Sequence, residues 1–453
     1  MDAYQINFAA LIGLCGALFL AQPKAKEATS ETKDGKAGEK KTKRTTDTTD
    51  ASQWPFLVVF CLVMGSDWLQ GPFLYSLYRE EHGISASTVS TLFTTGFLSG
   101  AVSGYFVGAL ADKHGRKAAC LLFCAAYTAS CLLTTIPSVP LLFAGRVLGG
   151  ISTSMLFSVF DSWMVTDFQN RKLADKGCDL SRTFGLMSTL NSVTAIISGV
   201  FSEWIVAVTG TRKAPFVTSM LLLGVAAYFI STKWAENYGG SAKQEKKKDD
   251  KAEVIVDHTN KLSHILTDPK IIALGLASTM FEGSMYLFVF FWSPALNAAK
   301  TNDAGLPYGI IFASFMASGL AASLFFNVFM ERGLLRYITL MILILGAADV
   351  CFVSLSGAPR SEQSTFWIFC AFEACVGMYW PCMGLLKGKL ISDGARAQVY
   401  SVLRIPLNLF VVVSLMLTEG DAGYAQVFGA CSKLLMFSCL GLGAMVMNEE
   451  HLP

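Results

Sequence analysis

The sequence predicts an all-α, polytopic membrane protein made of two six-helix halves, and three observations lead to this fold class. The chain has 453 residues, of which 53% are hydrophobic and only 15% are charged, whereas a soluble protein of this size carries about 25% charged residues. The charges are clustered, so that uncharged runs reach the ~20 residues needed to cross a bilayer. These runs form two sets of six, separated by a charged stretch. A β-barrel would instead show alternating hydrophobicity in ~10-residue segments.

The N-terminal region, residues 1–21, contains an apolar segment at 4–21 that is at the short end for a membrane span. It lacks the basic stretch that opens a cleaved signal peptide. We therefore expect a retained extra transmembrane helix with a short external N-terminus. Residues 22–53 are rich in Lys, Thr, Glu and Asp and have no apolar periodicity. This composition predicts a disordered, charged cytoplasmic linker.

The core is predicted to contain two halves of nearly equal length, which indicates a duplicated architecture. The N-terminal half is expected at 54–233, with spans near 54–78, 88–111, 117–136, 140–166, 182–208 and 214–233. A charged cytoplasmic linker, 234–269, follows it. The C-terminal half is expected at 270–447, with a cytoplasmic tail at 448–453 and spans near 270–293, 307–329, 335–355, 365–387, 397–418 and 425–447. The extra N-terminal helix would bring the total to thirteen.

The positions of Lys and Arg predict the orientation, because cytoplasmic loops carry an excess of basic residues. The even-numbered loops of the core contain most of them: Lys113, Arg116, Lys117, Arg171, Lys172, Lys176, the 243–251 lysine cluster, Arg332, Arg336, Lys387, Lys389 and Arg396. Both ends of the twelve-helix core are therefore expected in the cytoplasm. The chain carries no retention signal, so the plasma membrane is its expected location.

The ten residues 108–117, GALADKHGRK, lie between two apolar segments and are interpreted as a tight, basic, cytoplasmic turn. Gly115 would reverse the chain, Asp112 would pair with Arg116, and Lys117 would help to hold the loop inside. The pattern resembles the loop signature that joins the second and third helices of the major facilitator superfamily. The resemblance implies that superfamily's fold, with Asp112, Arg116 and Lys117 in an inner gate. The alternative is a positive-inside anchor without a gating role.

The fourth span opens with the sequence GRVLGGIST at residues 145–153. It resembles a second signature of the superfamily, an Arg near the outer end of helix four followed by Gly at four-residue spacing. Arg146, Gly150 and Asp161 share one helical face, and we assign Arg146 and Asp161 to the gate. The alternative is close helix packing with a snorkelling Arg146.

Charged residues inside the spans need a reason, because each costs at least ~2.5 kcal/mol by insertion scales. Asp67 in the first core span and Glu282 in the seventh both fall near mid-depth. Arg182 and Arg404 begin the fifth and eleventh spans, and duplication relates the members of each pair. Since two-half transporters bind their substrate between the repeats, we expect these four side chains to face one central cavity.

The arginines favour an anionic ligand, because a guanidinium forks onto a tetrahedral oxyanion through two N–H bonds. We assign Asp67 and Glu282 to coupling or switching, and two alternatives remain open. Either an acid is protonated when the anion binds, which would couple transport to protons, or each acid pairs with an arginine in the empty state and releases it. A permanent salt bridge, such as Asp161 with Arg182, is the purely structural interpretation.

Three further residues share the helical faces of these charges. Glu373 in the tenth span is assigned to the same coupling or switching group. Tyr286 aligns with Glu282, and Trp380 aligns with Glu373, so both aromatic residues are assigned to substrate binding. Aromatic residues at this spacing more often pack against their neighbours.

The core also resembles a narrower family, the molybdate-anion transporters of the major facilitator superfamily. The resemblance covers about residues 54–447 and the apolar N-terminus, and is carried by SDWLQGPFLYSLY (66–78), GRVLGGISTSMLFSVFDSW (145–163), KWAENY (233–238), FEGSMYLFVFFWSPAL (281–296), YGIIFASFMAS (308–318), GMYWPCMGLLKGK (377–389) and LRIPLN (403–408). It implies high-affinity uptake of molybdate, a tetrahedral dianion. The positions that match the family pattern are Asp67, Trp68, Glu282, Trp292, Pro294, Arg404 and Pro406. The chain departs from the pattern at Asp161, where the family often has Glu, and in its Lys-rich 22–53 linker.

These observations predict a monomeric secondary active transporter for molybdate, embedded in the lipid bilayer and working by alternating access. One alternative is another substrate, such as sulfate or an organic solute, and another is a non-transporting receptor or scaffold with the same fold. Paired acids and arginines at the midplane disfavour a scaffold. The sequence contains no GxxxxGK[ST] motif, no nucleophile–base pair and no metal-ligand cluster. We therefore expect no enzyme activity, no cofactor and no nucleic-acid partner.

Overall fold

A computed structural model describes most of the chain as helices. It covers residues 2–22, 46–176, 178–239, 268–300, 305–330, 335–357, 360–390, 396–417 and 423–448. For residues 396–405, which include Arg404, only the backbone is described. Most of the predicted 22–53 linker, most of the 234–269 linker and all but one residue of the predicted tail therefore lie outside the described residues.

The N-terminal half begins with a 23-residue helix that is followed by shorter helical pieces. Its elements are α2 (Thr46–Trp68), α3 (Leu74–Ser76), the π-helical turn η1 (Leu77–Glu81), α4 (Ala86–Ser103), α5 (Val107–His114), α6 (Arg116–Thr134), α7 (Val139–Leu156), α8 (Val159–Asn170), the 3-10 turn η2 (Ala174–Lys176), α9 (Leu180–Thr209) and α10 (Ala214–Lys233).

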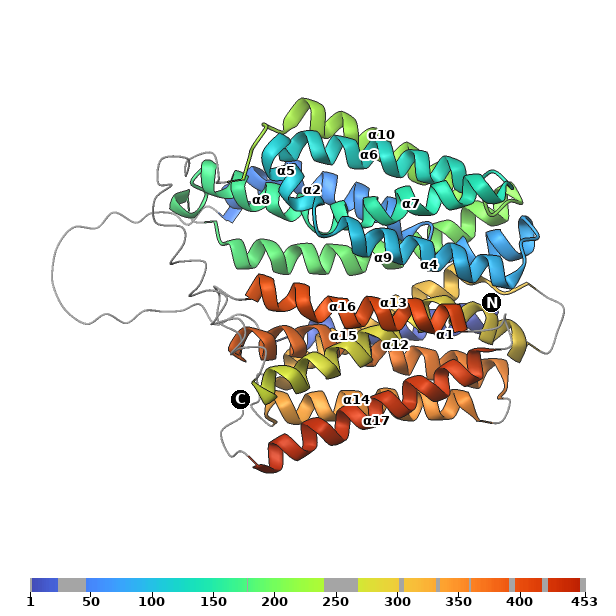
Figure 1. Cartoon of the computed structure of the whole chain (residues 1–453). Coiled ribbons are helices and arrows are strands. Elements are labelled where there is room, and N and C mark those ends of the chain that lie inside the picture. Colours follow the sequence, from blue (N-terminus) through green and yellow to red (C-terminus); the bar gives the residue numbers. More distant parts are fainter. Residues whose placement is uncertain are drawn as a thin grey trace.

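The C-terminal half contains six long helices and is accompanied by the N-terminal helix of the chain. These elements are α12 (Pro269–Ala299), α13 (Tyr308–Met330), α14 (Tyr337–Ser356), α15 (Glu362–Leu390), α16 (Arg396–Leu417), α17 (Tyr424–Asn448) and α1 (Ala3–Leu20). Figure 1 shows the two halves as two layers of nearly parallel helices, with α1 beside the C-terminal half although it precedes the N-terminal half in sequence.

The helices have the length and composition of membrane spans. Within the described residues, ten helical spans are long and apolar enough to cross a bilayer. The bent pair α4 and α5 makes an eleventh if it is one span. Several of these helices begin where a side chain caps the free backbone N–H groups. Ser85 accepts a hydrogen bond from the Thr88 N–H (3.3 Å), Asp179 from Ser181 (3.1 Å) and Asp268 from Lys270 (2.8 Å). The all-helical, polytopic membrane class predicted from the sequence is confirmed.

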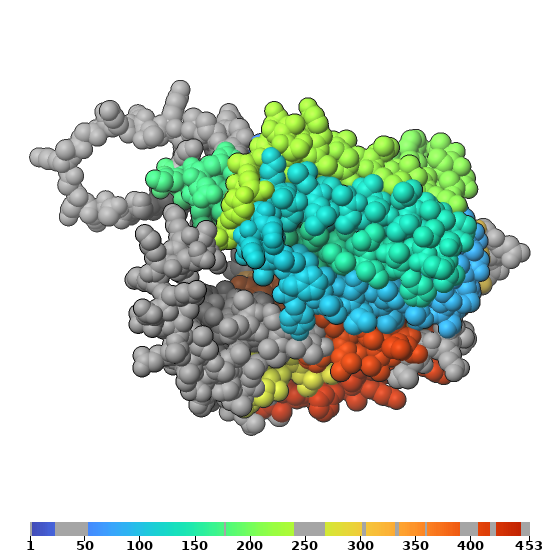
Figure 2. Space-filling model, turned by 45° about the horizontal axis from the view of Figure 1, so that its top comes forward, coloured from blue at the N-terminus to red at the C-terminus, as the bar shows by residue number. Residues whose placement is uncertain are grey.

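The two halves meet mainly where α9 packs against α13 and α4 packs against α16, with a smaller contact between α3 and α12. In the space-filling view the blue-to-green N-terminal half lies directly against the orange-to-red C-terminal half (Figure 2). We call one end of the bundle the basic end, because α5, α8, α10 and α15 end there with Lys113, Arg171, Lys233 and Lys387 nearby. The opposite end, where α9 ends and α13 begins, is the far end.

Helix α1 packs against α13 and reaches α15 at the far end. The Tyr4 hydroxyl donates to a Glu362 carboxylate oxygen (2.6 Å), and the Asn7 side chain donates to that of Gln363 (2.9 Å). Deeper along α1, the Cys15 thiol donates to the Ala317 carbonyl (3.2 Å). The apolar segment predicted at 4–21 is thus a helix that docks on the C-terminal half. This docking buries the side chains of Tyr4, Leu11 and Cys15.

Several predicted spans differ in detail from the helices of the structure. The predicted 88–111 span is two helices that meet at 51°, and the 140–166 span is interrupted around Phe157 and Ser158. The first core helix stops at Trp68, ten residues before its predicted end, because Gly71 and Pro72 follow within four residues. Residues 46–53 of the predicted disordered linker belong to α2.

The predicted ten-residue turn at 108–117 is also too long. Helix α5 continues to His114, and the reversal is confined to Gly115, whose φ of 109° is open to glycine and strained for other residues. Helix α6 starts at the next residue, Arg116. The loop is therefore a one-residue hinge between two helices, which places Asp112 and Arg116 on adjacent helix ends.

Candidate functional site

In the N-terminal half, Asp67 forms a polar cluster with a tyrosine from a neighbouring helix. The Tyr127 hydroxyl of α6 donates a hydrogen bond to an Asp67 carboxylate oxygen. The next residue on α2, Trp68, donates its indole N–H to the Asn191 side chain on α9 (2.8 Å). Asp67 is therefore a half-buried acid whose carboxylate has a hydrogen-bond donor on a neighbouring helix.

In the C-terminal half, Glu282 has three polar neighbours. Its Oε1 accepts hydrogen bonds from the Ser278 hydroxyl (2.6 Å) and the Tyr379 hydroxyl (2.8 Å), and it lies 3.5 Å from the Lys387 ammonium. The side chains of Glu282 and Lys387 are only 12% and 15% exposed. The Lys387 ammonium also lies 2.8 Å from the Ser278 hydroxyl. A buried ion pair needs such additional hydrogen bonds to offset its desolvation.

The two clusters are alike in one respect that the sequence analysis missed. Asp67 and Glu282, which duplication relates, each accept a hydrogen bond from a buried tyrosine, Tyr127 on α6 and Tyr379 on α15. The tyrosines come from helices that are not equivalent in the two halves. Sequence spacing relates residues only within one helix, so it gave no signal for either tyrosine. Lys387 was counted as a loop residue because it lies in the last turn of a span.

The structure separates the predicted substrate-binding residues. Arg182, near the basic end of α9, is exposed, and Arg404 lies on α16 with its side chain outside the described residues. Tyr286 faces the N-terminal half, where its ring is 5.3 Å from that of Phe97. Trp380 is 48% exposed and contacts the neighbouring ring of Tyr379 edge-on. Of these four, Tyr286 is the residue that the described structure places at a contact between the halves.

Glu373 is buried, with 7% of its surface exposed. It lies on α15, one turn before Gly377, where the helix passes so close to Gly319 of α13 that there is no room for a side chain. Within the described part of the chain, neither an ion pair nor a side-chain hydrogen bond joins Glu373 to another residue. An isolated buried carboxyl group is costly when charged.

Arg146, which we assigned to the gate, lies against α4. Its Nε donates to the Leu92 carbonyl (3.3 Å), and its guanidinium lies 5.1 Å from the centre of the Phe93 ring. Asp161 is half-buried in the first turn of α8. Neither Asp161 nor Arg182 takes part in an ion pair among the described residues. The salt bridge between them that one interpretation required is not formed in this structure.

The loop at the basic end contains the predicted pair of opposite charges. Asp112 Oδ1 accepts from both Arg116 Nε (2.8 Å) and Arg116 Nη2 (2.7 Å), and hydrogen bonds between two charged groups are stronger than neutral ones. Arg116 also donates to the Ser162 carbonyl (3.0 Å) and, through a very short bond, to the Thr166 hydroxyl. The loop therefore joins α5 and α6 to α8 within the N-terminal half.

A second element at this end was predicted as linker. Residues 234–239, which we call the strap, leave α10 and bind the same loop. Glu236 accepts hydrogen bonds from the N–H groups of Lys117 (2.7 Å) and Ala118 (3.0 Å), so its carboxylate caps the first turn of α6. Lys117 donates its ammonium back to the carbonyls of Ser231 (3.0 Å) and Trp234 (2.9 Å). These residues form the start of the stretch predicted as the 234–269 linker.

The strap continues to hold the loop beyond Glu236. The Arg116 N–H donates to the Asn237 carbonyl (2.9 Å), and the Gly239 N–H donates to the Asp112 carbonyl (3.1 Å). On the other side, the Trp163 indole N–H donates to the Ala235 carbonyl (2.9 Å). These bonds connect α8, the 108–117 loop and the end of α10 into one unit.

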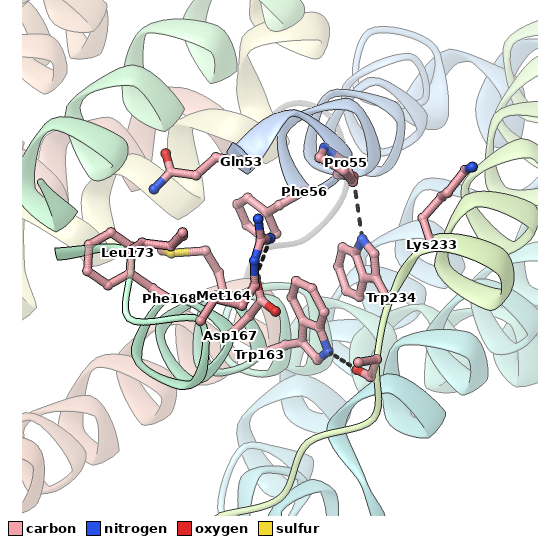
Figure 3. Close-up of a pocket in the computed structure, with 12 residues that line it drawn as sticks. Gln53, Pro55, Phe56, Trp163, Met164, Asp167, Phe168, Leu173, Lys233 and Trp234 are labelled. Carbon is pink, nitrogen blue, oxygen red and sulfur yellow. Dashed lines mark hydrogen bonds and ion pairs between the residues drawn. The ribbon is translucent and has the colours of Figure 1, made fainter. Parts of the chain in front are cut away.

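A cavity of about 260 Å³ lies beside this unit, at the basic end of the N-terminal half (Figure 3). Aromatic rings form much of its wall: Trp163 and Trp234 stack with ring centres 3.7 Å apart. Arg171 and Asp167, which pair at 3.1 Å, also line it, as does Lys233. All its lining residues belong to the N-terminal half. It is therefore separate from the predicted cavity between the halves.

Comparison with known proteins relates this arrangement to a family. The model of a family described as sugar transporters with 12 transmembrane segments matches residues 28–356, more than half of the chain. The chain belongs to this family of transporters. The molybdate-anion transporter of Takifugu rubripes is 27% identical over 422 residues, covering 85% of each protein. That of Xenopus tropicalis is 29% identical, covering 88% of this chain and 87% of that protein. The predicted kinship with the molybdate-anion transporters is confirmed.

Solved transporter structures share the fold of this transporter. The nucleoside transporter NupG superposes with a TM-score of 0.66 at 14% identity, covering 86% of this chain and 99% of that one. A D-xylose-proton symporter gives a TM-score of 0.63 at 12% identity, covering 90% and 98%. Likeness at this identity concerns the fold alone. The major facilitator fold predicted from the gate loop is confirmed, and the protein is a membrane transporter rather than an enzyme.

Proposed function

We propose that this transporter carries molybdate across the plasma membrane by alternating access, as a monomer. Four relatives that are 27–29% identical bear the name molybdate-anion transporter, and the two-layer fold has a seam between its halves (Figure 1). We place both ends of the twelve-helix core in the cytoplasm, with α1 as a thirteenth span and its N-terminus outside. The basic end then faces the cytoplasm, and the far end faces outward.

The observation that carries the proposal is the Glu282–Lys387 pair. A lysine ammonium held 3.5 Å from a carboxylate, with Ser278 and Tyr379 bound to the same carboxylate, is a cation neutralised inside its own half. An oxyanion that enters the cavity competes for this cation. When Lys387 leaves, the Glu282 carboxylate keeps the hydrogen bonds that the Tyr379 and Ser278 hydroxyls donate to it. The exchange differs from the predicted one in using Lys387 as the released cation.

The remaining assignments follow the same logic. Arg182 and Arg404 supply further positive charge on α9 and α16, the two helices whose partners in the other half are α13 and α4. Asp67 and Glu373 are coupling acids, and Tyr286 and Trp380 line the path of the substrate. At the cytoplasmic end, Asp112, Arg116 and Lys117 form the inner gate, with Asp161 on the adjoining helix and Arg146 deeper in the same half.

Measuring cellular molybdenum tests the substrate. Transporter-deficient cells that express the chain are supplied with nanomolar molybdate, with and without excess sulfate, and their molybdenum is measured by mass spectrometry. We expect wild type to accumulate molybdenum, sulfate not to compete, and Arg404→Ala to lose accumulation at equal surface level. A correctly located wild type that accumulates none would show that molybdate is not the substrate.

A variant of Lys387 and a matched control test whether this lysine takes part in transport. We expect Lys387→Ala to reduce accumulation at least tenfold, because Glu282 would keep its charge without a neighbouring cation; loss of one partner of a buried ion pair costs about 3–5 kcal/mol. Lys389→Ala is the matched control, since Lys389 is exposed and lies 4.8 Å from the Tyr337 ring. Equal accumulation by the two variants would remove Lys387 from the site.

A further inference from the structure

Contacts between the two halves gather at the far end, on residues that the sequence analysis did not single out. The Tyr308 hydroxyl of α13 donates to a Glu80 carboxylate oxygen (2.5 Å), and the Gly309 N–H donates to a Glu203 carboxylate oxygen (2.7 Å). On the other side of the seam, the Ser90 hydroxyl donates to the Leu415 carbonyl (2.7 Å). All three bonds run from one half to the other.

Two glycines set the distance between α9 and α13 at this end. A methyl group on Gly309 would overlap the Gly199 carbonyl oxygen and lie 2.7 Å from the Glu203 Cβ. A methyl group on Gly199 would lie 2.8 Å from the Gly309 carbonyl oxygen. The helix backbones are therefore in direct contact, and only glycine fits on either side. This close approach brings the Gly309 N–H within reach of the Glu203 carboxylate.

Glu80 connects the contact to both halves. Besides accepting from Tyr308, it accepts from Arg212 Nη2 of its own half (2.5 Å). The Tyr308 hydroxyl in turn accepts a bond from the Asn297 side chain (2.7 Å). Trp292 packs edge-on against the Tyr308 ring, with the ring centres 5.9 Å apart. The charge on Glu80 is balanced by Arg212, so the bond to Tyr308 adds little electrostatic cost.

We propose that Glu80, Glu203, Tyr308 and Gly309, which we call the far-end latch, form the outer gate of the transporter, and that the Gly199–Gly309 crossing determines whether this gate can close. In an alternating-access cycle, α9 and α13 separate at the far end before substrate enters from outside. The latch bonds break in that step, and their re-formation seals the cavity. This inference rests on the proposed cycle, but it does not depend on which substrate is carried.

The crossing gives a direct test, because a methyl group at Gly309 is incompatible with the closed far end and compatible with a separated one. Ser90→Cys is the reporter, because Ser90 is only 7% exposed and lies between the two halves. The same chain without Ser90→Cys gives the background labelling of the native cysteines. A membrane-impermeant thiol reagent is added outside the cells. We expect Gly309→Ala to raise labelling of the reporter several-fold.

Gly346→Ala is the matched control, because Gly346 is a helical glycine of α14 with no atom within 4 Å of an added methyl group. Equal labelling in the Gly309→Ala and Gly346→Ala backgrounds, at equal surface amounts, would overturn the proposal. The labelling requires no substrate, so failure of the molybdate proposal leaves its outcome interpretable.

A second variant covers the case in which Gly309→Ala fails to reach the surface. Glu203→Ala removes the acceptor of the Gly309 N–H without adding bulk, and a lost charge-assisted hydrogen bond shifts the closed-to-open ratio by about tenfold. We expect increased labelling in Glu203→Ala and an intermediate value in Glu203→Gln, whose amide oxygen still accepts from Gly309. Unchanged labelling in Glu203→Ala would contradict the latch independently of the glycine variant.

Discussion

Each half has one close helix crossing at which glycines bring two backbones into contact, and the two crossings can be compared residue by residue. Gly150 on α7 lies against Gly96 and Gly100 of α4, and Gly377 on α15 lies against Gly319 of α13. The residue four positions earlier differs in charge: Arg146 in the first half and Glu373 in the second. The duplicated fold therefore keeps the close contact of the backbones but places opposite charges beside it.

The Gly150 crossing makes a stability prediction. A methyl group there would lie 2.8 Å from the Gly100 N and would overlap the Gly96 carbonyl oxygen. We expect Gly150→Ala to destabilise the protein by about 1–3 kcal/mol through overpacking, seen as a lower melting temperature in detergent. Gly224→Ala is the control, because nothing lies within 4 Å of its added methyl group. Equal melting temperatures of Gly150→Ala and Gly224→Ala would contradict the close packing of α4 and α7 at Gly150.

Individual residues were the part of the site that sequence could predict least. Charge within an apolar run identified Asp67, Glu282 and Glu373, because a buried charge is conspicuous in any sequence. Their partners Tyr127 and Tyr379 come from other helices, so their contact depends on packing angles that no one-dimensional spacing contains. The same limit explains why the four far-end latch residues were not singled out.

At the scale of elements, helix positions were predictable, whereas helix ends were predictable for some helices only. The α10 and α13 boundaries agree with the prediction to within one residue, because uninterrupted apolar runs have no competing structure. Helix α12 continues through Pro294 to Ala299, beyond its predicted end at residue 293. In a membrane, neighbouring helices can satisfy the backbone groups that a proline frees.

The strap is the element with the clearest testable role. We expect Glu236→Ala to lower the free energy of unfolding by about 1 kcal/mol, because two N–H groups of α6 lose their cap. Limited proteolysis should also cut the strap faster. Glu236→Gln should lie between, since its amide oxygen still accepts a hydrogen bond, and the exposed Asp175→Ala should behave like wild type. If Glu236→Ala had the stability and the proteolysis rate of wild type, the capping of α6 by the strap would not contribute to stability.

At the scale of the whole molecule, α1 is a seventh helix of the C-terminal half. Its polar contacts, from Tyr4 to Glu362 and from Asn7 to Gln363, are made to that half. Sequence indicated the helix but not where it docks, because a single apolar helix of low amphipathicity carries no sign of its partner. If the halves move as bodies, α1 moves with α13 and α15.

Cross-linking tests this movement. A disulfide between Asn7→Cys and Gln363→Cys should leave molybdenum accumulation within about twofold of wild type, because a bond inside one moving body does not restrict the relative motion of two. The same double variant under reducing conditions is the control. Loss of transport that returns on reduction would show that α1 and the C-terminal half move relative to each other.

The stacked indoles at the base of the strap provide an optical signal. Trp163 and Trp234 lie 3.7 Å apart with an interplanar angle of 13°, near enough for their electronic transitions to couple. Such a dimer contributes a paired band to the near-ultraviolet circular dichroism spectrum, and its fluorescence is quenched relative to that of isolated indoles. Because the chain has only eight tryptophans, release of the strap would be visible in the intrinsic spectrum without any label.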